Sequence, residues 1–234
     1  MHIIQSTFKK LFLPTTLTIV VLTMISITSF AQRPQQHAFS KDVSTIQKYD
    51  QIYKPAKQPI LFVGSSSVRK WGTLQRDFGQ YVVLNRGVGG FVINDLIYFA
   101  DQLIFKYQPR QIIMYVGEND LPQKSATADT VFNRFVKLYT LIRSKLPDIP
   151  FGYIALKPSP SRAQFDEKCK AANKLIKDYL SKQPHSRFID VYTPMINNGH
   201  ARKELFVSDM LHMNPKGYAI WKKLVKPYLL KPVQ

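Results

Sequence analysis

Five short apolar segments alternate along the chain with segments whose apolar residues recur at helical spacing. The expected strands are residues 60–63, 81–85, 111–116, 151–156 and 187–191. The expected helices are residues 94–107 and 130–146, a helix that carries Cys169 and ends near residue 182, and a last helix that begins at Pro215. Strands that alternate with helices form a parallel sheet, covered by helices on both faces and joined by right-handed crossovers. The pattern therefore predicts one α/β domain built on a five-stranded parallel sheet.

Capping residues indicate where two of these helices begin. Asn94 is expected to cap the helix over 94–107, and Asn214 to cap the last helix, because asparagine side chains accept hydrogen bonds from the first free backbone N–H groups. Pro215 suits the first turn that follows. A further short helix is expected over Asp42–Tyr53, ahead of the first strand.

The first strand leads into a cluster of hydroxyl groups. Ile60–Val63 does not alternate with polar residues, which indicates a strand buried on both faces. Gly64 permits a tight turn at its carboxyl end, and Ser65, Ser66 and Ser67 follow. In an open parallel sheet, ligands bind outside the carboxyl ends of the strands. A serine placed there could be a nucleophile, although serines also suit a turn that caps the next helix.

Other polar and glycine residues fall at the same edge of the expected sheet. Gly90 follows the second strand, Asn119 follows the third, and Asp209 and His212 lie between the fifth strand and the last helix. Each has an ordinary structural explanation: a turn glycine, a helix cap, or a capping aspartate beside a surface histidine. Because all of them are expected at one edge of the sheet, a shared functional site explains them better than separate structural roles do.

Acyl transfer is the chemistry that these residue types suit. A serine hydroxyl attacks only when a base takes its proton, and a carboxylate holds the histidine base in one tautomer. Ser66, His212 and Asp209 are the candidates for these roles. Because Asp209 and His212 are three residues apart, they are expected on one side of a single helical turn. The backbone N–H groups of Ser66 and Gly90 and the Asn119 amide could bind an oxyanion.

Four short motifs in chain order resemble the conserved blocks of the SGNH/GDSL hydrolase family. They are Gly64–Ser67, Gly90 within Asn85–Gly90, Gly117–Asp120 and Asp209–His212. The segments Lys157–Arg162 and His212–Tyr218 are similar to those of its platelet-activating-factor-acetylhydrolase-like branch. The resemblance implies a three-layer α/β/α flavodoxin-like fold. It also implies hydrolysis of esters, often acetyl groups on sugars or lipids, without a metal or other cofactor, with Ser66, Asp209 and His212 as the triad.

Two residues depart from the family pattern. Ser65 stands where the family's naming motif has an aspartate, and since Ser66 matches the nucleophile position, activity is still expected. Phe91 follows Gly90 where a small polar residue is common. Either it narrows the acyl pocket or it packs inside the domain.

The N-terminus has the layout of a signal peptide. Lys9 and Lys10 precede the uncharged segment Leu11–Phe30, and Ala31 completes a small-x-small cleavage pattern. We therefore expect a signal peptide over residues 1–31, an N-terminal arm over 32–57, and the hydrolase domain over 58–234. An uncleaved anchor is the alternative, because the apolar segment is long enough to span a bilayer.

The chain is strongly basic, which bears on its partners. The formal charge is +18, and it falls to +16 when residues 1–31 are removed, because they hold two lysines and no acidic residue. Such a field favours an acidic polysaccharide or an anionic envelope surface. Nucleic acid is not expected, since no motif for binding it is present. A basic, solvated surface with no such partner explains the charge equally well.

The leading expectation is an exported esterase, periplasmic or secreted, that cleaves a short acyl ester of a small molecule or glycan. An acyltransferase with the same acyl-enzyme and a non-catalytic binding module on a hydrolase fold are the alternatives. The oligomeric state stays open. Cys169 is the only cysteine, which excludes an internal disulfide, and no Cys/His cluster has the spacing of a zinc site.

Overall fold

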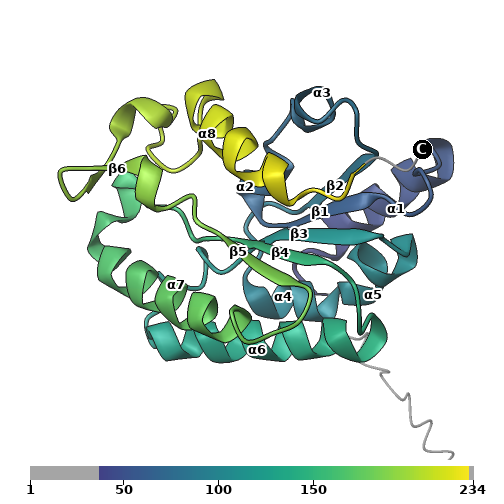
Figure 1. Ribbon diagram of the computed structural model, residues 1–234, viewed down its shortest axis with the longest axis horizontal. Helices are drawn as coiled ribbons and strands as arrows, with labels where there is room; N and C mark the ends of the chain where they lie inside the picture. Colours follow the sequence, from purple (N-terminus) through teal and green to yellow (C-terminus); the bar gives the residue numbers. More distant parts are fainter. Residues whose placement is uncertain (1–36, 232–234) are drawn as a thin grey trace, which may run out of the picture. The chain divides into compact units, whose positions relative to one another are not determined.

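The computed structural model describes residues 37–231, and the expected signal peptide lies outside them. Its main sheet confirms the predicted fold class. The strands are β1 (Ile60–Gly64), β2 (Val83–Gly87), β3 (Gln111–Tyr115), β4 (Phe151–Ile154) and β5 (Ser186–Ile189). All neighbouring strands run parallel, in the order β2-β1-β3-β4-β5 (Figure 1). β1 is therefore flanked by β2 on one side and β3 on the other.

Helices cover both faces of this sheet and complete three layers (Figure 1). One face carries α2 (Ser66–Arg69), α3 (Leu74–Asp77) and α8 (Pro215–Val225). The other carries α4 (Ile93–Tyr98), α5 (Ala100–Leu103), α6 (Ala128–Lys145) and α7 (Asp166–Leu180), with α1 (Ser40–Ile52) packed beside α5. Short 3-10 helices are η1 (Phe105–Tyr107), η2 (Pro160–Phe165), η3 (Thr193–Met195), η4 (Lys203–Leu205) and η5 (Lys226–Tyr228).

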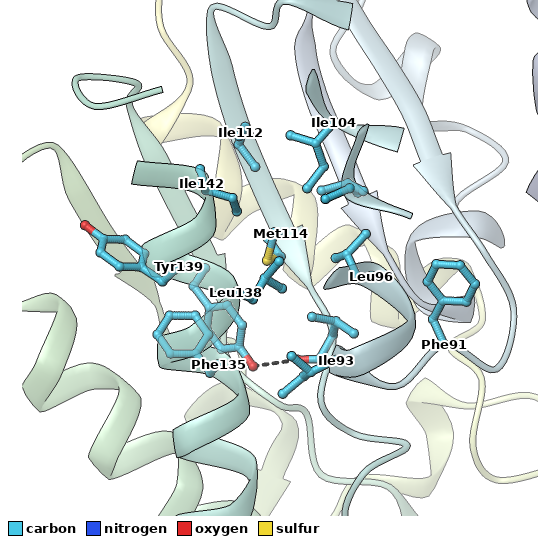
Figure 2. Packing of buried hydrophobic residues seen from close by; sticks show 14 of the residues in the cluster. Phe91, Ile93, Leu96, Ile104, Ile112, Met114, Phe135, Leu138, Tyr139 and Ile142 are labelled. Carbon is cyan, nitrogen blue, oxygen red and sulfur yellow. Dashed lines mark hydrogen bonds between the residues drawn. The ribbon is translucent and has the colours of Figure 1, made fainter. Parts of the chain in front are cut away.

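The strands bury side chains on both faces because helices cover both. Alternate residues of β1 enter different cores: Phe62 packs with Trp71, whereas Leu61 belongs to the cluster under α6. Figure 2 shows part of the cluster between the sheet and α6, where Leu138 of α6 lies against Met114 of β3. The described residues include no helix that is both long and apolar enough to cross a membrane.

Several predicted boundaries differ from the observed ones. β2 begins and ends two residues later than expected, because the polar residues at its end find partners: Asn85 donates to the Val68 carbonyl. The helix expected over 94–107 is interrupted at Phe99 and Ile104, although its buried residues keep helical spacing. Asn94 is not its cap. The helix begins at Ile93, and the Asp95 carboxylate accepts the Val92 N–H.

Other expectations hold. The Asn214 side chain caps α8 by accepting the N–H groups of Lys216 and Gly217. Cys169 is buried in the core, where its Sγ donates to the Leu156 carbonyl at 3.4 Å and burial raises the pKa of the thiol. A two-stranded antiparallel hairpin that was not predicted, β6 (Ile196–Asn197) with β7 (His200–Ala201), precedes η4.

The described part of the expected N-terminal arm packs as one compact unit with the domain. Val43 of α1 joins the core, and Asp50 is buried. The Asp50 carboxylate pairs with Arg86 of β2 and with the Tyr107 hydroxyl, which lies 2.6 Å away. Residues 37–57 are therefore packed against the domain that they precede.

Strands β1, β2 and β3 end at the same register position. Gly64 lies opposite Gly87 of β2 and Tyr115 of β3, and its carbonyl accepts the Val88 N–H at 2.8 Å. Gly64 has φ +141°, and a Cβ there would lie 1.8 Å from the Tyr115 carbonyl oxygen. Only glycine lets β1 turn this close to β3, which brings the residues that follow all three strands to one edge.

Changing Gly64 to alanine should therefore destabilise the domain. The backbone conformation alone costs about 1–3 kcal/mol for a residue with a Cβ, and the clash with a rigid backbone carbonyl adds to it. Gly72 is the matched control, because a Cβ added there would meet no atom within 4 Å. Urea unfolding should show a much lower midpoint for Gly64→Ala than for Gly72→Ala. Equal midpoints would contradict this account.

Candidate active site

Only Ser66 of the three adjacent serines contacts the predicted base. Ser65 and Ser67 are buried, 1% and 2% exposed. Ser66 begins α2 and is only partly buried, and its Oγ lies 3.0 Å from His212 Nε2. The turn at Gly64 thus directs the middle serine of the cluster toward the loop that precedes α8.

That loop is a turn, not the single helical turn that was expected. An antiparallel bridge between Phe206 and Met213 closes it, and Met210 has φ +54°, a left-handed conformation. Asp209 Oδ1 accepts the backbone N–H groups of Leu211 at 2.9 Å and His212 at 2.8 Å. Short polar side chains compete with helix formation in this way. The same aspartate therefore shapes the loop and faces the histidine.

The other oxygen of this carboxylate contacts the imidazole. Asp209 Oδ2 lies 2.6 Å from His212 Nδ1. Because an ionised carboxylate only accepts hydrogen bonds, the hydrogen-bond network assigns the proton to Nδ1. The unprotonated Nε2 then faces Ser66, as a base for its hydroxyl must.

The protonation of Asp209 follows from the same contacts. Partial burial by itself would raise the pKa of Asp209, but hydrogen bonds from the His212 ring and from the His212 and Leu211 N–H groups outweigh it and hold the pKa well below its usual range. The side chain is 43% exposed, whereas that of His212 is 16% exposed. Asp209 is therefore a carboxylate throughout the range in which histidine titrates.

The predicted oxyanion residues follow the two strands that flank β1. Asn119 lies just beyond β3, and its Nδ2 donates to the Phe91 carbonyl at 3.0 Å. Its Oδ1 accepts from Arg162 at 2.8 Å, and since a guanidinium only donates, this contact fixes which end of the amide is the oxygen. Gly90 lies beyond β2, is exposed, and has φ +85°. The second hydrogen of Asn119 Nδ2 and the Gly90 N–H thus join the Ser66 N–H as the candidate donors to an oxyanion.

Phe91 packs inside the domain, which decides between its two interpretations. It is fully buried, and its ring stacks on Phe99 at 5.9 Å between centroids. Phe39, from the segment ahead of α1, packs on it edge to face, with 5.0 Å between centroids, and lies next to Gly90. The loop that carries Gly90 is thus held by aromatic contacts. Figure 2 shows Phe91 at the border of the core.

Sequence reasoning missed a buried polar network beside these residues. Glu118, the residue before Asn119, accepts hydrogen bonds from Lys157, Ser159 and Tyr115. Lys157 also donates to the Leu211 carbonyl at 2.8 Å, within the Asp209–His212 loop. The available signal was the place of Lys157, directly after the apolar run of the fourth strand. Because lysine is almost never fully buried without a partner, a lysine at that place indicates an acidic group nearby.

The groups of this network act on one another's pKa. Burial lowers the pKa of Lys157, although the Glu118 carboxylate beside it opposes this shift. Burial alone would raise the pKa of Glu118, but the charges of Lys157 and Arg162 outweigh burial and lower it. Burial and the neighbouring Glu118 carboxylate raise the pKa of Tyr115, which therefore stays a donor. Among residues 37–231, no three His, Cys, Asp or Glu side chains lie together as metal ligands would.

Two cavities lie near the loop. One, about 670 Å³, lies between η2, the start of α7 and the β6–β7 hairpin, and charged side chains line it. The other, about 460 Å³, lies between α3 and α8. Lys70, Arg76 and Lys222 line the second cavity, with Asp77 as its acidic residue, and Met213 of the loop borders it.

Comparisons with known proteins agree with this architecture. A structure from Streptococcus pneumoniae whose name refers to platelet activating factor is 20% identical, with a TM-score of 0.71 over 81% of this chain and 92% of its own. A GDSL-like lipase from Bacteroides thetaiotaomicron is 19% identical, with a TM-score of 0.62 over 79% of this chain and 97% of its own. An acetyl-xylooligosaccharide esterase from Geobacillus is 12% identical, with a TM-score of 0.58 over 77% of this chain and 99% of its own.

The similarities to solved structures show the fold of this chain. The family to which the chain belongs is shown by a sequence model of that family. No curated protein sequence matches the chain. The model of the GDSL-like lipase/acylhydrolase family matches residues 62–220. This range includes Ser66, Gly90, Asn119, Asp209 and His212. The chain therefore belongs to the GDSL-like lipase/acylhydrolase family of carboxylic ester hydrolases.

Proposed function

We propose that the protein is an exported serine esterase that removes a short acyl group, most simply acetyl, from a carbohydrate. The observation that carries the proposal is the alignment of Ser66 Oγ, the His212 ring and the Asp209 carboxylate, at 3.0 and 2.6 Å. It has the relay geometry of a serine hydrolase, with the base in the required tautomer.

The reaction proceeds through an acyl-enzyme. Ser66 Oγ attacks the ester carbonyl while its proton moves to His212 Nε2, and Asp209 offsets the charge of the imidazolium. The N–H groups of Ser66 and Gly90 and the Asn119 amide stabilise the oxyanion. The bond to the alcohol breaks, and the alcohol leaves with the proton from His212. Water then gives a proton to His212 and attacks the acyl group. The bond to Ser66 Oγ breaks, His212 returns the proton to Oγ, and the acid is released.

A carbohydrate substrate is supported by two observations. One of the structurally similar proteins is an acetyl-xylooligosaccharide esterase. The cavity beside η2 is lined by polar and charged residues such as Asp166, Lys170 and Lys203, which suit a glycan better than an acyl chain.

The test combines turnover with labelling. The purified protein should release nitrophenol from nitrophenyl acetate faster than from a long-chain ester, and an organophosphonate should label the chain once, at Ser66. Lys57 and Arg69 flank all three serines, so the tryptic peptide must be fragmented to locate the label. Absence of both turnover and label, or a label on Ser65 or Ser67, would overturn the proposal.

We further propose that the natural substrate is an anionic polymer or lies on an anionic envelope surface. The cavity between α3 and α8 supports this, because three basic side chains line it beside Met213, next to His212. Cationic clefts raise the local concentration of anionic substrates. Reversing two of these charges, in Lys70→Glu with Arg76→Glu, should slow hydrolysis of an acetylated acidic polysaccharide but not of a neutral acetylated oligosaccharide. Equal rates on both substrates would contradict it.

Asn119 should act mainly on the transition state. Asn119→Ala is expected to lower kcat by about 10²–10³-fold with little change in KM, because the lost donor binds the oxyanion and not the ground-state carbonyl. Arg162 and Phe91 lose their partner in the same variant, so thermal unfolding must show that it is folded. A raised KM with normal kcat would place Asn119 outside the oxyanion hole.

Export is proposed from the N-terminal pattern of basic, apolar and small residues. Protein recovered from the periplasm or medium should begin at or near Gln32, as read by intact mass and N-terminal sequencing. Retention of residues 1–31 in membrane-bound protein would favour the anchor instead.

A further inference from the structure

We propose that Lys157 is a positioning residue of this active site: its buried ammonium holds the Asp209–His212 loop at a fixed place relative to the end of β3, from which Asn119 projects. This inference rests on the proposed function and extends it to a residue that does not touch the reacting atoms.

The contacts of Lys157 reach both sides of the site. Its side chain is 0% exposed, and its Nζ donates to Glu118 Oε1 at 2.9 Å, to Ser159 Oγ at 2.6 Å and to the Leu211 carbonyl at 2.8 Å. An ammonium has three N–H groups, so all of them are used. Leu211 directly precedes His212, so this bond acts on the backbone of the residue before the base.

The partner of Lys157 is itself fixed to β3. Glu118 accepts the Tyr115 hydroxyl at Oε2, 2.5 Å away, and the Ser159 hydroxyl at Oε1. Arg162 donates to the Glu118 carbonyl at 2.9 Å and to the Asn119 amide oxygen. The carboxylate that anchors Lys157 and the amide proposed for the oxyanion hole thus belong to one rigid assembly.

A neighbouring contact strengthens the same connection. Ser161 donates to the Met210 carbonyl through both its N–H and its Oγ, each at 3.0 Å. The segment that begins with Lys157 therefore holds two consecutive carbonyls between Asp209 and His212. Because Met210 is left-handed and the loop is a turn, no helical hydrogen bonds fix these carbonyls.

Stability alone does not account for a lysine at this position. A buried ion pair is often matched or surpassed in stability by apolar side chains of similar volume. A methionine could fill the space but would leave the Leu211 carbonyl without its ammonium partner. A displacement of 1 Å in a reacting group can cost about 10²-fold in rate, so fixing the loop matters more for turnover than for folding.

The test compares Lys157→Met with Arg143→Met. Arg143 is the matched control, because it also donates to backbone carbonyls, those of Pro147 and Ile149, but at the opposite edge of the sheet. Lys157→Met should lower kcat for nitrophenyl acetate by about 10²-fold with KM little changed, whereas Arg143→Met should keep kcat at a similar loss of Tm. Normal kcat in a folded Lys157→Met, or an equal kcat loss in both variants, would overturn the proposal.

Two further measurements keep the outcome decisive. If Lys157→Met does not fold because Glu118 is left as an unpaired buried charge, the double variant Lys157→Met with Glu118→Gln removes that charge and is judged by the same kcat. The low-field proton resonance of His212 Nδ1–H, assigned by its loss in His212→Ala, reports loop order without any substrate. It should broaden in Lys157→Met and persist in Arg143→Met. An unlabelled, inactive wild-type protein would refute the proposed function, while this resonance would still decide the role of Lys157.

Discussion

Replacing Ser66 by alanine is expected to lower kcat for a short-chain nitrophenyl ester by about 10⁶-fold, the loss typical of removing the nucleophile from a serine hydrolase. The acyl-enzyme cannot form, so the remaining rate comes from substrate binding and the oxyanion donors alone. The Oγ of Ser66 contacts His212 at the edge of the site and fills no core position. The variant should therefore unfold at the wild-type temperature.

The flanking serines are the controls for this loss. Ser65 and Ser67 are buried and do not contact His212, so Ser65→Ala and Ser67→Ala should keep kcat within about tenfold of the wild type once shown to be folded. A stopped assay with protein free of contaminating esterases is needed to measure so large a difference. Activity that persists in Ser66→Ala, or that disappears only in Ser67→Ala, would move the nucleophile.

Exchanging Asp209 for asparagine should lower kcat by about 10⁴-fold in a protein that remains folded. The asparagine amide oxygen can still accept the N–H groups of Leu211 and His212, as Asp209 Oδ1 does, so the turn is kept. Its amide nitrogen replaces Oδ2 beside His212 Nδ1. Because that nitrogen is a donor, it selects the tautomer with the proton on Nε2, which cannot take a proton from Ser66.

Asp209→Ala separates the two roles of this carboxylate, because it removes the turn bonds as well and should also lower Tm. The folded-state pKa of Asp209 is depressed, so its contribution to stability is present above the unfolded-state pKa and is lost as the pH falls through the folded-state value.

Near-normal kcat in Asp209→Asn would mean that another carboxylate orients the base. Asp120 and Asp190 are poor substitutes, since Asp120 is held by Ile93 and Arg134 and Asp190 by Thr193.

Periodicity predicted the parts of this protein that depend on burial. The apolar run Ile60–Val63 and its counterparts became the strands of the sheet. The ends of β1, β2 and β3 are in register, which is the basis for expecting Ser66, Gly90 and Asn119 at one edge. The interruption at Phe99 escaped prediction because the buried residues around it keep helical spacing. There, contacts with the rings of Phe91 and His37 accompany the change in backbone.

The parts that depend on specific hydrogen bonds were not predictable from spacing. Asp209 and His212 are three residues apart in a helix and in a turn alike, and only the bonds from Asp209 to the backbone decide for the turn. No neighbour in the sequence marks Lys157 as a member of a buried network, because its partners Glu118 and Leu211 are distant along the chain. Such pairings become visible only when the strands are placed side by side.

The burial of Cys169 protects the only thiol of this chain from the redox state of its surroundings. Attack on a disulfide needs an accessible thiolate, and both burial and the raised pKa of this thiol keep the reactive form scarce. With no second cysteine in the chain, an internal bridge cannot form. Because the Cys169 thiol is buried, thiol-linked dimers should not form in air-exposed solution either. The fold can thus be handled without reductant, and it would tolerate an oxidising compartment as well as a reducing one.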